Sequence, residues 1–219
     1  MTLQLFAHPF SSYSQKAIIA FYENDIPFRY RKLSSDDPAT GAEFATLWPL
    51  RRFPILLDGD RLILEATTIV EHLDAKYPGK TRFIPADPDA AVEVRMMDRV
   101  FDNYVSTPQQ KCVFDFLRKP DARDVEGVEE AKSMLDTTYD WLNTRMAERE
   151  WAAGDQFTLA DCSAAPSLFY ADWTHRIDKR FTHLLAYRQR LLARPSFARA
   201  VDEAREYRPL FPLGAPDRD

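Results

Sequence analysis

The sequence contains little of what builds metal centres or disulfide frameworks. Among its 219 residues there are only two cysteines, Cys112 and Cys162, too few for a disulfide framework or a metal cluster. The four histidines are scattered, and no two of them have metal-ligand spacing: His8, His72, His175 and His183. We therefore expect no bound metal, and a chain whose cysteines stay reduced.

Long apolar runs and an excess of basic charge are absent as well. No run approaches the roughly 18 apolar residues needed to span a bilayer. Residues 1–10 lack the basic start and the long apolar stretch of a signal peptide. The net charge is −5, which gives no electrostatic argument for nucleic acid or an anionic membrane. These absences predict a soluble cytoplasmic protein without nucleic-acid or membrane partners.

Residues 1–80 alternate strand-like and helix-like segments. Short apolar or alternating runs predict four strands, the last two joined by an Asp-Gly turn. Apolar residues at helical spacing predict three helices, the second of them short. In chain order the segments are a strand at 3–7, a helix at 12–24, a strand at 28–33, a helix ending at Leu47, strands at 55–57 and 62–64, and a helix at 65–77.

The rest of the chain has helical patterns only. A stretch rich in proline separates it from the first part, so we predict domains at 1–79 and 90–219 joined by a linker at 80–89. Thr158 and Asp161 have the spacing of a helix capping box. The expected helices are 91–105, one through Val128, Leu135 and Met146, and others near 159–173, 178–192 and 196–205.

Three local features in the first part each have a structural and a functional interpretation. Ser11 and Ser12 begin a helix, where a serine caps the helix or donates to an anion beside its free amides. The Phe53-Pro54 bond is a surface turn, or a cis bond whose Phe53 backbone pairs with an extended peptide. Glu65, Ala66 and Thr67 start another helix, which favours an acidic residue or holds a ligand carboxylate. Taken together, the three features fit a small anionic peptide with a thiol.

These residues, in this order and spacing, resemble the soluble glutathione transferase superfamily, as it occurs in bacteria. The resemblance covers essentially the whole chain, including the Thr158-Leu159-Ala160-Asp161 box and the final helices. It implies an α/β thioredoxin-like N-terminal domain, an all-α C-terminal domain, a homodimer, and glutathione as cosubstrate without a metal. The implied activity is that of a glutathione S-transferase acting in detoxification.

The resemblance also implies roles for single residues. Ser11 lies five residues before Lys16, similar to the catalytic serine of the zeta and tau classes, with Ser12 beside it. Tyr13 stands where the zeta class has Cys, and Lys16 replaces Arg. The glutathione-binding residues would be Phe53, Pro54, Glu65, Ala66 and Thr67, with Arg52 or Arg51 near the glycine carboxylate. Ala66 stands where the family usually has Ser.

Residues of the helical part are expected to form the electrophile pocket and the contact between two subunits. The resemblance implies a wall formed by Met97, Phe101, Tyr104 and Phe114. A stripe such as Met97, Phe101 and Tyr104 at helical spacing is more often part of the core, so that alternative stays open. A patch on helix 91–105 predicts a homodimer, in which Asp98 or Asp102 reaches the ammonium of the partner's ligand.

Two other functions stay open. One is a zeta-like cis-trans isomerase using Arg99, and the other is a non-catalytic binding or regulatory protein, which Ala66 favours.

Overall fold

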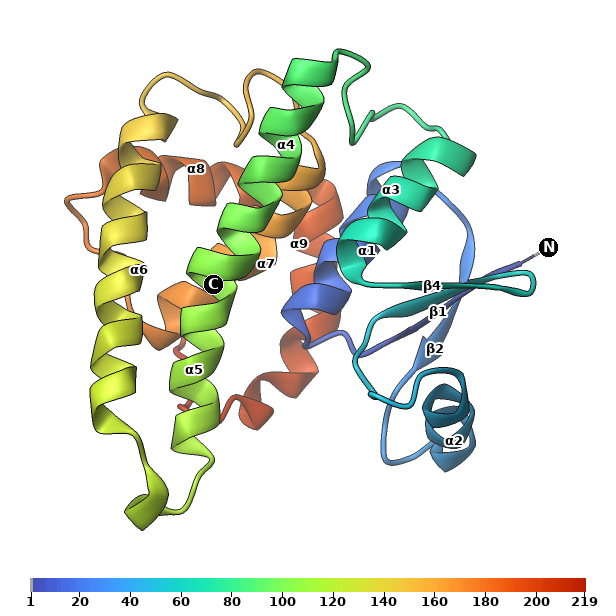
Figure 1. The fold of residues 1–219 in the computed structure, drawn as a ribbon, viewed down its shortest axis with the longest axis horizontal. Coiled ribbons are helices and arrows are strands. Elements are labelled where there is room, and N and C mark those ends of the chain that lie inside the picture. The colour runs from blue at the N-terminus through green and yellow to red at the C-terminus, as the bar shows by residue number, and fades with distance from the viewer. Residues whose placement is uncertain (1) are drawn as a thin grey trace.

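The N-terminal part of the computed structural model, which describes residues 2–219, is a four-stranded sheet covered by helices (Figure 1). Its elements are β1 (Leu3–Ala7), α1 (Ser12–Glu23), β2 (Phe28–Lys32), α2 (Pro38–Leu47), β3 (Ile55–Asp58), β4 (Arg61–Leu64) and α3 (Ala66–Lys76). The strand order is β2-β1-β3-β4; β1 is parallel to β2, and the other two pairs are antiparallel. This confirms the predicted order of strands and helices.

The sheet is buried on both faces, which explains its apolar strands. On one face, Leu5 and Leu56 have no exposed surface and belong to the main core, under α1 and α3. On the other face, Phe6 and Ile55 pack against Phe44 of α2 in a smaller cluster. A strand covered on both faces needs an apolar residue at nearly every position, as in β1.

The C-terminal part is all-helical (Figure 1). Its helices are α4 (Pro88–Val100), the π-helix η1 (Phe101–Ser106), α5 (Thr107–Phe116), α6 (Val125–Met146), α7 (Leu159–Thr174), α8 (Thr182–Ala193) and α9 (Pro195–Ala204), with short 3₁₀ turns η2 (Pro120–Ala122) and η3 (Arg205–Leu210). The predicted helix at 178–192 was wrong at its start. Asp178 to Phe181 form a turn closed by the Phe181 N–H on the Asp178 carbonyl, so the helix begins at Thr182.

The helix α7 is the centre of the C-terminal part, and a buried carboxylate fixes its start. Every residue from Leu159 to Trp173 is buried. The predicted capping box is confirmed, since the Thr158 side chain accepts from the Asp161 amide and Asp161 accepts from the Thr158 amide at 2.8 Å. Asp161 also accepts from the amide of Ala152 at 2.9 Å and the hydroxyl of Tyr187 at 2.6 Å. Burial raises the pKa of the Asp161 carboxyl, against the opposing effect of these donors.

The two parts are packed together rather than joined by a free linker. The chain between α3 and α4 spans 77–87, so the last two residues of the predicted linker 80–89 belong to α4. Phe83 in this segment has no exposed surface. The Phe83 amide donates to Asp74 at 2.8 Å, and its carbonyl accepts from the amide of Leu159. At the C-terminal end of α1, the carboxylate of Glu23 accepts hydrogen bonds from Arg194 and Ser196. The sheet domain is therefore anchored to the helical domain at several points.

The buried carboxylate of Asp161 predicts a large stability effect. Replacing Asp161 by alanine leaves the amides of Ala152 and Thr158 and the hydroxyl of Tyr187 without an acceptor. We expect the free energy of unfolding to fall by about 3 kcal/mol or more, measured by urea denaturation. The control is Asp87→Ala, which removes the exposed cap of α4 and should cost about 1 kcal/mol. Equal losses in the two variants would contradict this account.

Candidate active site

The register of the sheet brings the three predicted site segments to one edge. Phe6 of β1, Ile55 of β3 and Leu64 of β4 lie opposite one another across the sheet. Because β1 runs antiparallel to β3, and β3 antiparallel to β4, the chain after Phe6, the chain before Ile55 and the chain after Leu64 all leave the sheet on the same side. Those three segments carry Ser11, Phe53-Pro54 and Glu65-Ala66-Thr67, respectively.

Ser11 is the N-cap of α1. Its backbone is extended, and its Oγ accepts from the amide of Ser14 at 3.3 Å. Ser11 Oγ uses a lone pair in this bond, so its hydroxyl proton stays available for an anion. Ser14 is buried, and its hydroxyl accepts from the amide of His8. Ser12 is the first residue of the helix, half-buried beside Ser11.

The Phe53-Pro54 peptide bond is cis, which confirms the predicted isomer. Phe53 is 37% exposed, and its ring packs near that of Phe44 with centroids 6.3 Å apart. Within residues 2–219, no backbone hydrogen bond from Phe53 to another residue is present. The N–H and C=O of Phe53 are therefore free to pair with an added peptide. Arg51 and Arg52, just before it, are exposed.

The start of α3 combines free amides with backbone strain. Glu65 precedes the helix with φ = 68°, a positive value that is costly for a non-glycine residue, of the order of 1–3 kcal/mol. Glu65 is exposed and its side chain does not cap the helix, whereas Ala66 is 4% exposed. The first amides of a helix have no acceptor within it and carry partial positive charge. This end of α3 can therefore hold an anion beside a carboxylate.

A buried network of charges joins the starts of α1 and α3 to the helical domain. The ammonium of Lys16 lies 2.5 Å from Asp98 of α4 and 2.9 Å from Asp102 of η1, and all three side chains are at most 11% exposed. Lys16 also donates to the Thr67 hydroxyl at 2.9 Å, and Thr67 donates to Asp98. Burial acts to raise the pKa of Asp98, but Lys16 and Arg99 outweigh it and hold that pKa below its ordinary value.

The network corrects two predictions. Asp98 has no exposed surface and is paired within its own chain, as is Asp102, so neither is free to reach the ligand of a partner subunit. Arg99, named as a possible donor for the isomerase alternative, instead contacts Asp98, Asp102 and Thr67 beside α3. Lys16, used in the sequence only as a spacing marker, is the centre of the network. A lysine inside an apolar helix face was the one signal for this role.

The predicted pocket wall divides into buried and exposed residues. Met97 and Phe101 have no exposed surface and belong to the hydrophobic core, so the prediction that they line an open pocket was wrong. Tyr104 and Phe114 are 50% and 53% exposed and are available to a ligand. The facing of Tyr104 and Phe114 depends on the π-helix η1, whose wider turn cannot be read from the sequence.

Tyr13 is a residue that the sequence reasoning set aside. It is half-buried in the first turn of α1. Desolvation, followed by the negative charges of Asp102 and Glu65, raises the pKa of the Tyr13 phenol to about 12, with Arg99 acting in the opposite direction. Tyr13 therefore stays protonated at neutral pH and lies near the groups at the start of α3.

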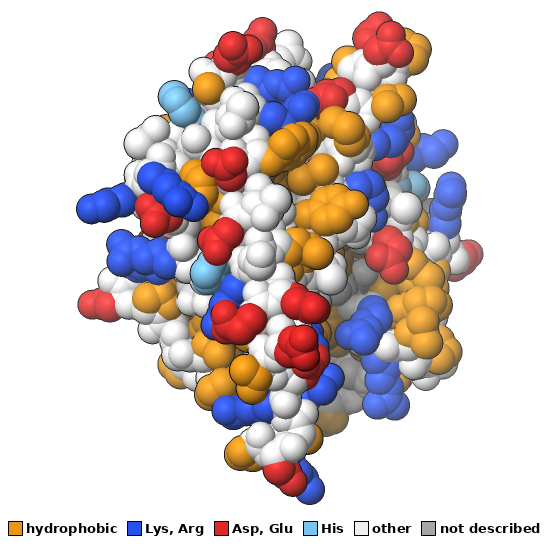
Figure 2. Space-filling view, turned by 60° about the vertical axis from the view of Figure 1, so that its left-hand side comes forward, with side chains coloured by type: hydrophobic (Ala, Val, Ile, Leu, Met, Phe, Trp, Pro, Cys, Tyr) orange, Lys and Arg blue, Asp and Glu red, His pale blue; other side chains and the backbone are white. Residues whose placement is uncertain are grey.

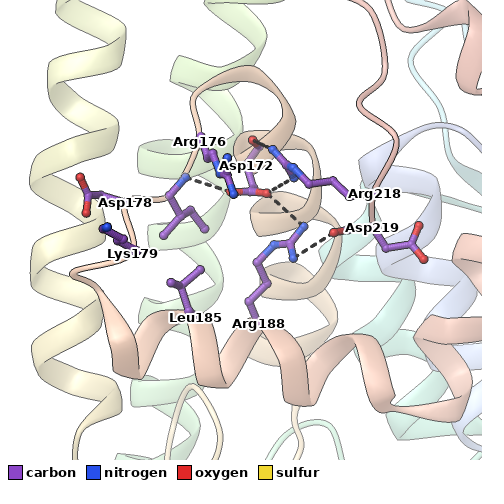
Figure 3. Close-up of a pocket in the computed structure, with 9 residues that line it drawn as sticks. Asp172, Arg176, Asp178, Lys179, Leu185, Arg188, Arg218 and Asp219 are labelled. Atoms are coloured by element: carbon purple, nitrogen blue, oxygen red, sulfur yellow. Dashed lines mark hydrogen bonds and ion pairs between the residues drawn. The ribbon is translucent and has the colours of Figure 1, made fainter.

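A second concave region lies away from these residues. Figure 3 shows this cavity, of about 560 Å³, between the end of α7, α8 and the final residues. Asp172 in its wall pairs with Arg188 and Arg218, and the Ile177 amide donates to the same carboxylate. None of the predicted site residues lines it. Among residues 2–219 there is no group of three or more His, Cys, Asp or Glu side chains placed to hold a metal.

Comparison with known proteins agrees with this architecture. Residues 5–81 match the family model of the glutathione S-transferase N-terminal domain, and residues 125–190 match that of the C-terminal domain. "Glutathione S-transferase 3" of Zea mays is 28% identical over 211 residues, covering 91% of this chain and 93% of the relative. The "Stringent starvation protein A homolog" of Haemophilus ducreyi is 26% identical, with 91% and 89% covered.

Solved structures give the same result. The apo structure titled glutathione S-transferase III has a TM-score of 0.76 and 26% identity, covering 92% of this chain and 96% of the other. The structure of a glutathione S-transferase of Methylobacillus flagellatus with GSH bound has a TM-score of 0.83 and 22% identity. The match covers 91% of this chain and 98% of the other. A mixed sheet of thioredoxin type joined to an all-helical domain is the architecture of a two-domain glutathione transferase. This chain belongs to the glutathione S-transferase family.

Among residues 2–219 no helix is both long enough and apolar enough to cross a membrane.

The buried network predicts a stability effect of Lys16. Lys16→Met leaves Asp98 and Asp102 with Arg99 as their one remaining cation in the network. Breaking a buried ion pair from one side costs about 3–5 kcal/mol, so we expect that loss in the free energy of unfolding from urea denaturation. Arg95→Met, which breaks an exposed pair with Glu71, should cost less than about 1 kcal/mol. A loss for Lys16→Met no larger than for Arg95→Met would refute the assignment.

The same network predicts a pH dependence. The pKa of Asp98 is lower in the folded than in the unfolded chain, so its stabilising effect is present above the unfolded value of about 3.9 and disappears as the pH falls through the folded value. The difference in unfolding free energy between the wild type and Lys16→Met should therefore be largest near pH 7 and shrink below about pH 4. A difference that stays constant from pH 7 to pH 3 would argue against a charged Asp98–Lys16 pair.

Proposed function

We propose that this chain binds glutathione at the edge of its sheet and promotes attack of the glutathione thiolate on a small hydrophobic electrophile. The observation that carries the proposal is the meeting of Ser11, Phe53 and the start of α3 at one edge. These segments offer a hydroxyl, an unpaired stretch of backbone and free helix amides. The family membership of both domains supports the same function.

In this mechanism Ser11 is a hydrogen-bond donor and not a nucleophile. Its Oγ accepts from the helix. The remaining hydroxyl proton would be donated to the sulfur. A thiol with a free pKa of about 8.5 becomes more acidic at a helix N-terminus. Each unit of lowering is about 1.4 kcal/mol in favour of thiolate. The thiolate then forms the C–S bond, while the electrophile releases its leaving group. We assign the site to the serine type on this basis.

The rest of the peptide is held by the other two segments. The cysteinyl backbone of glutathione pairs with Phe53, beside Pro54. The γ-glutamyl carboxylate lies on the amides of Ala66 and Thr67, and its ammonium pairs with Glu65. Arg52 meets the glycine carboxylate. Tyr104 and Phe114 form the exposed aromatic surface that the electrophile contacts, in place of the buried Met97 and Phe101.

A non-catalytic binding protein is the second candidate. Two observations favour it: the similarity to the "Stringent starvation protein A homolog", and Ala66, which removes a hydroxyl from the carboxylate site. Glutathione-affinity chromatography and thiolate absorbance at neutral pH separate the two functions, because a scaffold needs neither. Nothing favours the isomerase, since Arg99 is fixed beside α3.

The relatives named above come from a plant and from bacteria, so the predicted bacterial source stays a prediction.

The protein should form a homodimer. Figure 2 shows exposed apolar side chains lying among charged ones on one face of the molecule. On α4, Val92 is 65% and Met96 is 40% exposed, and Met134 and Trp141 of α6 are exposed as well. The patch on α4 belongs to the helix that the sequence assigned to the interface. A two-fold contact through this patch is the commonest way to cover it.

We expect light scattering at micromolar concentration to give twice the 25.4 kDa of the chain. Val92→Asp should shift the mass toward the monomer, because it would place a carboxylate in the contact. Met134→Asp, which adds the same charge on α6, serves as the control and should leave the dimer intact. A monomer mass for the wild type would reject the proposal.

The catalytic assignment predicts different effects for two neighbouring serines. Ser11→Ala should lower kcat/KM in a conjugation assay by about 10- to 100-fold, the loss of one hydrogen bond to a charged group. Ser12→Ala should have a much smaller effect, because Ser12 is inside the helix rather than at its cap. If Ser12→Ala were impaired and Ser11→Ala behaved as the wild type, the role would pass to Ser12. Circular dichroism of both variants checks that α1 is retained.

A further inference from the structure

The proposed carboxylate site at the start of α3 has one donor fewer than its position suggests. Ala66 carries a methyl group where the family resemblance places a serine hydroxyl, and it is almost fully buried. The hydroxyl of the next residue, Thr67, is already engaged by Lys16 and Asp98. A ligand carboxylate here therefore has backbone amides but no side-chain hydroxyl, unless another residue supplies a donor.

Arg99, at the end of α4, lies beside this site and is rigidly held. Its Nε donates to Asp98 at 3.0 Å, and its Nη2 donates to Asp102 at 2.7 Å. The same Nη2 contacts the Thr67 hydroxyl, so the guanidinium is fastened directly to the first turn of α3. A guanidinium fixed on one edge loses little conformational freedom when it binds an anion on the other.

One nitrogen of the Arg99 guanidinium, Nη1, is not used in these bonds. Across residues 2–219, Nη1 of Arg99 makes no hydrogen bond or ion pair. The Arg99 side chain is 52% exposed, whereas those of Asp98 and Asp102 are 1% and 11% exposed. The network holds two cations and two carboxylates, but its carboxylates are buried below and its guanidinium lies at the surface. The surface that a ligand meets is therefore cationic.

Arg99 and Glu65 both lie at the start of α3, since Arg99 contacts the hydroxyl of Thr67 in the first turn and Glu65 is the residue that precedes the helix. Glu65 is exposed and forms no ion pair within the described chain. A fixed cation and a free carboxylate around one helix start match the carboxylate and ammonium of an α-amino acid head group.

We propose that Arg99 binds the α-carboxylate of the γ-glutamyl group through Nη1 and so replaces the hydroxyl that Ala66 lacks. The inference rests on the proposed function, because it takes glutathione as the ligand of this edge. It makes the site selective for thiol peptides that carry a complete α-amino acid head group, with Glu65 binding the ammonium and Arg99 the carboxylate.

The test compares two peptides by isothermal titration calorimetry. One is glutathione, and the other is γ-aminobutyryl-cysteinylglycine, which has the same backbone and thiol but no α-carboxylate. The wild type should bind the second peptide about 10- to 100-fold more weakly, the effect of one charge-assisted hydrogen bond. Arg99→Gln should weaken glutathione binding by a similar factor and leave the affinity for the shorter peptide unchanged. Arg99→Lys should weaken glutathione binding by a smaller factor than Arg99→Gln does.

The matched control is Arg95→Gln, one turn earlier on α4, where the arginine is bound to Glu71 at the surface. It should discriminate between the peptides as the wild type does. If Arg99→Gln weakens both peptides equally, Arg99 acts only by supporting the fold, and the inference is wrong. The inference is equally wrong if Arg99→Gln keeps the full discrimination. If the wild type binds neither peptide, the proposed function itself fails, and this inference with it.

Discussion

The buried ammonium of Lys16 is the interaction on which the arrangement of the site depends. It joins α1, α3, α4 and η1 through Thr67, Asp98 and Asp102, so one side chain fixes the starts of two helices against the second domain. Removing such charges from water is costly, and only close pairing compensates for it. That requirement is met in a single arrangement of the four elements. The network therefore restricts how the two helix starts can lie relative to each other.

The sheet sets the other half of the geometry. Phe6, Ile55 and Leu64 share one row, so the segments after β1, before β3 and after β4 must meet at one edge. Each segment leaves a polar group unpaired there: the proton of Ser11, the backbone of Phe53 and the amides of α3. Unpaired backbone groups are rare in folded proteins. Their concentration at one edge, next to the strained Glu65, indicates a place for a ligand rather than for packing.

Much of this could be predicted from the sequence, because the signals are local. The strands follow from apolar runs and the Asp58-Gly59 turn, and the cap of α7 follows from Thr158 and Asp161. The facing of residues along the helical domain could not be predicted. Met97 and Phe101 were expected in a pocket and are core, because helical spacing alone does not say whether an apolar stripe faces the core or a ligand. The network around Lys16 was missed for a different reason: its contacts with Thr67 and Asp102 join residues that are 51 and 86 positions apart in the sequence.

The structural and functional interpretations of Ser11 are compatible, and this is how the site can be stable before a ligand arrives. As a cap, Ser11 gives its lone pair to the Ser14 amide and needs no other partner. As a donor it uses the remaining proton, which capping leaves free. Arg99 divides its donors in the same way, with Nε and Nη2 holding the fold and Nη1 not used in these bonds. Each of these side chains is thus oriented by a bond that stabilises the protein, so the group left over would need little ordering when the proposed ligand binds.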